Sequence, residues 1–79
     1  MTENERAVMS AAYRYLDEYS KPPVKGSPGY GAYWERACER MSEIALEHKN
    51  HPLALKVLAG IYSYLDEKSK AIDRKAGIA

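Results

Sequence analysis

The placement of the prolines is the feature that most constrains how this chain can fold. Three of its four prolines lie in Lys21–Gly31, a segment that also holds three glycines, and the fourth is Pro52. Proline removes a backbone N–H and clashes with the preceding turn, so a helix ends or restarts at both places. In the stretches between them, apolar residues recur every three or four positions, as on one face of a helix. The chain is therefore divided into three amphipathic segments.

These segments predict an all-α protein, a small three-helix up-down-up bundle that forms a single helical domain over residues 1–79. We expect helices at about 3–20, 32–49 and 52–75, with a long Pro/Gly loop at 21–31 between the first two. Thr2 and Glu5 have the spacing of a capping box, which starts the first helix. Asn50 or His51 is the expected N-cap of the third helix, and Gly77 its expected C-cap.

Charge and cysteine content exclude several classes of protein. Twelve Lys+Arg against eleven Asp+Glu give a net charge of +1, so no bulk field attracts nucleic acid or an anionic membrane. The one cysteine cannot form an internal disulfide. No apolar run approaches the roughly 20 residues needed to span a bilayer, and Met1–Glu5 is acidic where a signal peptide is basic. We therefore expect a cytoplasmic protein with no membrane partner.

An internal repeat links the first and third predicted helices. Val8–Lys21 aligns without gaps on Val57–Lys70, with eight identities in fourteen positions. One interpretation is that two equivalent surfaces bind the same partner or build a symmetric assembly. The other is that two amphipathic helices flanking one neighbour meet similar packing demands, or retain a trace of duplication. Helix patterning alone constrains these positions, which favours the second interpretation.

The third predicted helix has more apolar surface than two neighbours require. One stripe consists of Leu55, Leu58, Tyr62 and Leu65, and a second consists of Leu53, Val57, Ile61 and Tyr64. This helix is expected to lie centrally and to leave part of its surface, near Val57 and Tyr64, for a second copy or a larger protein. We therefore predict a homo-oligomer, most simply a dimer, with these candidate interface residues: Tyr13, Tyr15, Val57, Ile61, Tyr62 and Tyr64.

A second candidate site lies in and after the loop, where cations alternate with aromatic side chains. Such a combination can stack bases or hold a peptide. The alternative is that the aromatic residues pin the loop to the bundle. The candidate binding patch consists of Lys21, Lys25, Tyr30 and Tyr33.

The second predicted helix carries a regular row of carboxylates. Its apolar positions, which include Trp34 and Ile44, form a seam that is expected to face the core. The carboxylates lie opposite that seam, where Arg36 and Arg40 can pair with them, which is typical of a solvated face. The row consists of Glu35, Glu39, Glu43 and Glu47.

No combination of residues indicates catalysis. Glu47, His48 and His51 fit no metal-binding spacing, so His48 is expected at the edge of the core and His51 at a helix cap. Cys38 precedes His48 by ten residues on one helix, about 15 Å along its axis, which is too far for a catalytic dyad. We expect this thiol to be buried or half-buried. We predict no enzymatic activity, no metal and no cofactor.

Two functions remain open. The first is a non-enzymatic protein-protein interaction or self-assembly module that works through helix faces. The alternative is a small nucleic-acid-associated regulatory protein that uses the basic residues of the loop and of the segment Lys68–Lys75. The first predicts a mass that depends on concentration, and the second predicts binding that weakens steeply with salt.

Overall fold

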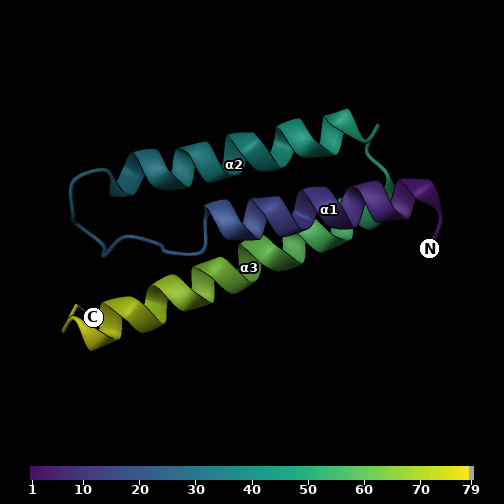
Figure 1. The fold of residues 1–79 in the computed structure, drawn as a ribbon. Coiled ribbons are helices and arrows are strands. Elements are labelled where there is room, and N and C mark those ends of the chain that lie inside the picture. The colour runs from purple at the N-terminus through teal and green to yellow at the C-terminus, as the bar shows by residue number, and fades with distance from the viewer. Residues whose placement is uncertain (79) are drawn as a thin grey trace.

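A computed structural model describes residues 1–78 of the chain and contains three α-helices. They are α1 (Glu3–Glu18), α2 (Tyr30–Glu47) and α3 (Pro52–Lys75), and no strand occurs within residues 1–78. The prediction of an all-α protein is confirmed. Figure 1 shows α2 running opposite to α1 and α3, and each helix contacts both others.

The helix starts follow from capping chemistry. The predicted capping box is confirmed, because the Thr2 hydroxyl accepts from the Glu5 N–H while the Glu5 carboxylate accepts from the Thr2 N–H. Gly29 has a φ of 85° and is the N-cap of α2, so this helix starts at Tyr30 rather than at the predicted position 32. At α3, the Nδ1 atom of His51 accepts from the Leu53 N–H.

Each helix also ends at a defined residue. The first helix ends at Glu18, two residues earlier than predicted, so residues 19–29 connect α1 to α2. Beyond α3, Gly77 takes a left-handed conformation and lets the N–H of Ile78 reach the Asp73 carbonyl at 2.8 Å. A similar pattern follows the end of α2 at Glu47, where Lys49 and Asn50 both have a φ of 53° and the N–H of Asn50 donates to the Ala45 carbonyl at 2.7 Å.

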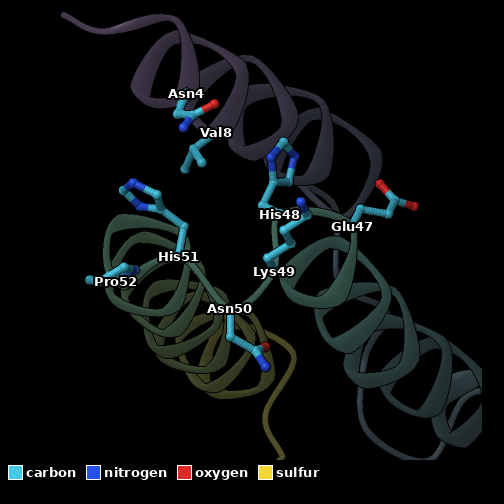
Figure 2. Close-up of a pocket in the computed structure, with 8 residues that line it drawn as sticks. All are labelled: Asn4, Val8, Glu47, His48, Lys49, Asn50, His51 and Pro52. Carbon is cyan, nitrogen blue, oxygen red and sulfur yellow. The ribbon is translucent and has the colours of Figure 1, made fainter.

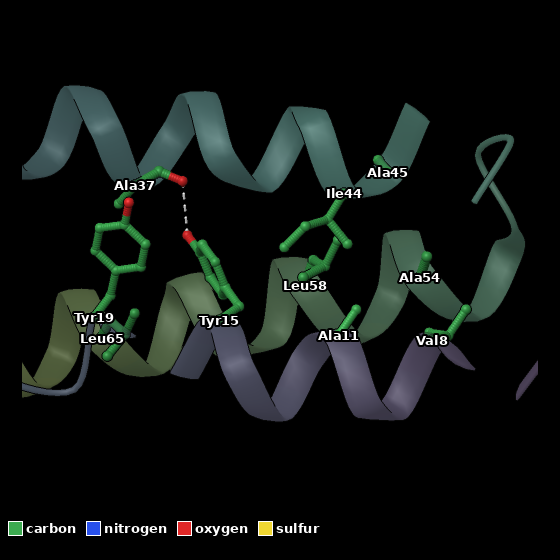
Figure 3. Close-up of a cluster of buried hydrophobic side chains, with 10 residues drawn as sticks. All are labelled: Val8, Ala11, Tyr15, Tyr19, Ala37, Ile44, Ala45, Ala54, Leu58 and Leu65. Carbon is green, nitrogen blue, oxygen red and sulfur yellow. Dashed lines mark hydrogen bonds between the residues drawn. The ribbon is translucent and has the colours of Figure 1, made fainter. Parts of the chain in front are cut away.

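The core lies where the three helices meet and contains several small side chains (Figure 3). Alanines from every helix allow close approach, and larger residues fill the space between them. The predicted seam of α2 faces inward, with Ile44 buried and Trp34 half-buried. Figure 3 shows these buried residues: Val8, Ala11, Tyr15, Tyr19, Ala37, Ile44, Ala45, Ala54, Leu58 and Leu65.

Tyr15 belongs to this core, and its assignment to the candidate interface was wrong. Its side chain is 1% exposed, and its hydroxyl donates to the carbonyl of Ala37 at 2.9 Å. The hydroxyl can be buried because that carbonyl satisfies it. Burial raises the pKa of Tyr15 above its ordinary value.

Candidate functional site

An apolar groove between α2 and α3 is the first candidate site. It has a volume of about 420 Å³, and its floor includes the buried residues Ala45 and Leu58. Leu46 of α2 and Leu55 of α3 also line it, yet they remain 68% and 47% exposed. The full lining consists of Met41, Ser42, Ala45, Leu46, Asn50, Leu55, Leu58 and Ala59. Leucines exposed beside a hollow mark a contact surface more strongly than isolated leucines do.

Sequence reasoning missed most of this groove. It placed Leu55 and Leu58 on one apolar stripe of the third helix but assigned the free surface to the other stripe, near Tyr64. The available signal was Leu46, an apolar residue far from the α2 seam led by Trp34. Which stripe stays open depends on how α3 is rotated against its neighbours, and helical periodicity does not specify that rotation.

The structure separates the remaining candidate interface residues. Tyr13 and Tyr64 are 73% and 52% exposed, whereas Val57 and Ile61 are half-buried and Ile61 packs against the core. Tyr62 is also half-buried, with its ring 5.7 Å from that of Trp34. The six residues therefore do not form one surface patch.

Tyr62 also contacts the single cysteine. The sulfur of Cys38 lies 3.3 Å from the Tyr62 hydroxyl oxygen, and the hydrogen bond between these groups, together with burial, raises the pKa of Tyr62 to about 12. Cys38 is exposed, which corrects the expectation of a buried or half-buried thiol. Its position on α2 lies beside the seam of Trp34 and Met41 rather than within it, which leaves the residue exposed.

The candidate loop patch is divided between surface and core. Lys21 and Lys25 are exposed. The Tyr33 hydroxyl donates to the carbonyl of Tyr19, and its ring lies 5.0 Å from that of Trp34. Burial raises the pKa of Tyr33 to about 12. Tyr33 therefore holds the start of the segment 19–29 against the bundle. The ring of Tyr30 makes a looser edge contact with Trp34, with the ring centres 6.4 Å apart.

Residues 19–29, which connect α1 to α2, are also hydrogen-bonded to α3. Lys68 donates from its ammonium to the carbonyl of Ser20, and the backbone N–H of Lys25 donates to Asp73 Oδ1 at 2.9 Å. Asp73 is largely buried. These bonds place the loop lysines beside the last turns of α3, although 48 residues separate the partners in each pair.

The carboxylate row of α2 is paired with arginine, as predicted. Arg36 contacts Glu39 and Glu43 at 3.4 Å, and Arg40 contacts Glu43 at 3.1 Å and Glu47 at 3.2 Å. The hydrogen bond from Arg40 holds the pKa of Glu43 below its ordinary value. These side chains reach solvent, which screens the charges, so each pair contributes little to stability.

A second hollow, of about 390 Å³, is lined by the start of α1, the end of α2 and the start of α3 (Figure 2). His48 and His51 stand on either side of it, and Asn4 and Val8 reach it from α1. His51 already uses Nδ1 to cap α3. Within residues 1–78, no three His, Cys, Asp or Glu side chains are grouped so as to hold a metal ion.

None of the helices formed by the described residues is long and apolar enough to cross a membrane. Comparison of the chain with protein-family models, with curated proteins and with solved structures finds no match.

Proposed function

We propose that this protein is a non-enzymatic, cytoplasmic self-association module, a three-helix up-down-up bundle whose α2/α3 groove docks on the same groove of a second copy. The observation that carries the proposal is the pair of exposed leucines, Leu46 and Leu55, beside an apolar hollow. Burying a leucine side chain contributes about 1.5–3 kcal/mol, and a two-fold interface would bury both residues from each copy.

Charge supports a second copy as the occupant. None of the eight residues that line the groove is charged. In a two-fold interface each residue lies near its own symmetry mate or near the same few neighbours, so a charged lining of one sign would repel itself. An uncharged lining avoids this cost, and the exposed Ser42 and Ala59 leave room for a leucine of the partner.

The dimensions of the molecule also support side-by-side docking. Its principal extents are 45 × 20 × 16 Å, and α2 and α3 run along the long direction. A side bounded by 45 × 20 Å covers at most roughly 900 Å², which is large enough to include an interface of the standard size of about 800 Å² per partner. End-to-end contact offers less than half of that area.

Light scattering over a concentration series tests the proposal. The wild-type mass is expected to rise from one chain to two, and Leu46→Glu combined with Leu55→Glu is expected to hold the mass at one chain. Both residues are exposed, so the fold should survive, which circular dichroism would check. The matched control is Tyr13→Glu with Tyr64→Glu, two residues of similar exposure away from the groove lining. Loss of the dimer in the control alone would place the interface at Tyr13 or Tyr64 instead of the groove.

A wild-type protein that remains a single chain at every concentration would overturn self-association. The groove would then be left for a helix of a larger protein, because amphipathic helices commonly dock in such grooves.

The alternative function, a small nucleic-acid-associated regulatory protein, is favoured by a different observation. The bonds from Lys68 to Ser20 and from Lys25 to Asp73 bring the loop lysines to the basic end of α3. Salt-dependent binding to DNA or RNA would test this function, and it would proceed through a surface other than the groove.

A further inference from the structure

Charge is unevenly distributed along this nearly neutral chain. The connection (residues 19–29) and the segment 68–78 together hold six of the twelve Lys+Arg residues but one of the eleven Asp+Glu residues. We call these six residues the basic end: Lys21, Lys25, Lys68, Lys70, Arg74 and Lys75. The rest of the chain has six basic and ten acidic residues, so the molecule has opposite charge in its two parts.

The tertiary structure keeps this charge on the surface. Asp73, the single carboxylate of the region, is largely buried and accepts from the backbone N–H of Lys25. The ammonium of Lys68 donates to the carbonyl of Ser20, and Lys70 pairs with Asp66 at 3.1 Å. Among the six cations of the basic end, those left exposed without an ion pair to a described residue are Lys21, Lys25, Arg74 and Lys75.

We propose that the basic end binds the phosphodiester backbone of a nucleic acid, with these four cations as its phosphate contacts. This inference rests on the alternative function and is independent of self-association. A row of phosphates matches cations that are spread over two segments, because backbone binding needs charge at intervals rather than a shaped pocket. The paired carboxylates of α2 lie outside this region, so the field of the whole protein favours approach through the basic end.

Two features favour a nucleic acid over other anionic partners. Stable binding to a membrane surface commonly combines cations with apolar side chains that insert beside them. The large apolar residues that the structure exposes within residues 1–78 all lie outside the two segments 19–29 and 68–78: Met1, Met9, Tyr13, Leu46, Leu55 and Tyr64. An acidic peptide would likewise need an apolar anchor at this surface. By contrast, the half-buried ring of Tyr30, at the end of the connection, is a surface on which a base can stack.

The expected binding is weak, non-specific and dependent on salt. Four phosphate contacts give a slope of about −3 to −4 for log K against log salt, so affinity should fall roughly 100-fold between 50 and 200 mM salt. The slope measures the number of contacts directly. Removal of the cations should therefore lower both the affinity and the slope.

Fluorescence anisotropy with labelled single-stranded RNA, single-stranded DNA and duplex DNA tests the inference. The variant carries Lys21→Glu, Lys25→Glu, Arg74→Glu and Lys75→Glu. The matched control carries four reversals elsewhere on the surface, Arg6→Glu, Arg14→Glu, Lys49→Glu and Lys56→Glu, and so has the same net charge. The first variant should lose at least 100-fold in affinity at low salt, whereas the control should lose less than tenfold.

Each contrary outcome is distinct. No binding of wild-type protein to any of the three probes would overturn both the inference and the alternative function. Equal losses in the two variants would keep nucleic-acid binding but overturn the assignment to the basic end. Binding to vesicles of anionic lipid without binding to nucleic acid would identify a membrane surface as the partner. Light scattering on the first variant would show separately whether self-association persists.

Discussion

The two halves of the internal repeat lie in α1 and α3 and have different environments at aligned positions. Tyr15 is 1% exposed and bonded to the backbone of α2, whereas its counterpart Tyr64 is 52% exposed. The leucines behave in the opposite way, since Leu16 is half-buried and its counterpart Leu65 is completely buried. Identical residues at aligned positions therefore differ in how far their side chains are exposed.

The difference is a rotation of one helix relative to the other. In α1 the core takes Val8 and Tyr15, whereas in α3 it takes Leu58 and Leu65, which align one position later. One residue corresponds to about 100° around a helix. Both helices have a broad apolar stripe, and each turns a different part of that stripe inward. The repeat thus provides two helices that can pack, while the surface left over differs between them.

The largest expected effect that would sharpen this comparison comes from the aligned tyrosines. Tyr15→Ala removes a fully buried ring and should destabilise the fold by about 3–5 kcal/mol, enough to unfold a domain of this size. Tyr64→Ala removes a half-exposed ring and should cost less than about 1 kcal/mol. Urea denaturation followed by circular dichroism measures both. Similar losses in the two variants would break the comparison.

The aligned leucines should show the reverse order with a smaller difference. Leu65→Ala leaves a cavity in the core and should cost about 2–5 kcal/mol. Leu16→Ala affects a partly buried side chain at the edge of the core and should cost about 1–2 kcal/mol. Thermal unfolding of the two variants under identical conditions compares them. A larger loss at Leu16 would contradict the burial of Leu65 as the deeper of the two positions.

The smallest effect comes from removing a single hydroxyl. Tyr15→Phe loses the bond to Ala37 and should cost about 1 kcal/mol at neutral pH, whereas Tyr64→Phe should be nearly neutral. Chemical denaturation at neutral pH resolves this difference if several repeats are averaged. An equal cost at the two positions would contradict the assigned role of the Tyr15 hydroxyl.

Alkaline pH extends this last test. Burial raises the pKa of Tyr15, and it raises the pKa of Tyr33 to about 12, while tyrosine in the unfolded chain ionises near pH 10. A raised pKa in the folded state contributes stability that is present below about pH 10 and is lost as the pH rises toward 12 and beyond. Tyr15→Phe should therefore lose less stability than the wild type over that range. Parallel pH curves for the two proteins would show that Tyr15 does not contribute.

The sequence by itself determined the local structure of this protein. Pro22 and Pro23 follow the end of α1, Pro52 is the first residue of α3, and the capping pair of Thr2 and Glu5 acts within one turn. The paired carboxylates of α2 were equally predictable, because residues three or four apart on a helix are neighbours. The start of α2 was misplaced by two residues because the left-handed conformation of Gly29 lets Tyr30 begin the helix.

Only the tertiary structure decided which apolar surfaces are buried in the core and which stay exposed. Two stripes on α3 were equivalent by periodicity, and the packing of α1 and α2 left the groove at Leu46 and Leu55 open. The contact of Lys25 with Asp73 likewise joins residues 48 positions apart, which no local spacing indicates. The physical reason is that helix patterning acts over a few residues, whereas the rotation and neighbours of a helix depend on how all three pack at once.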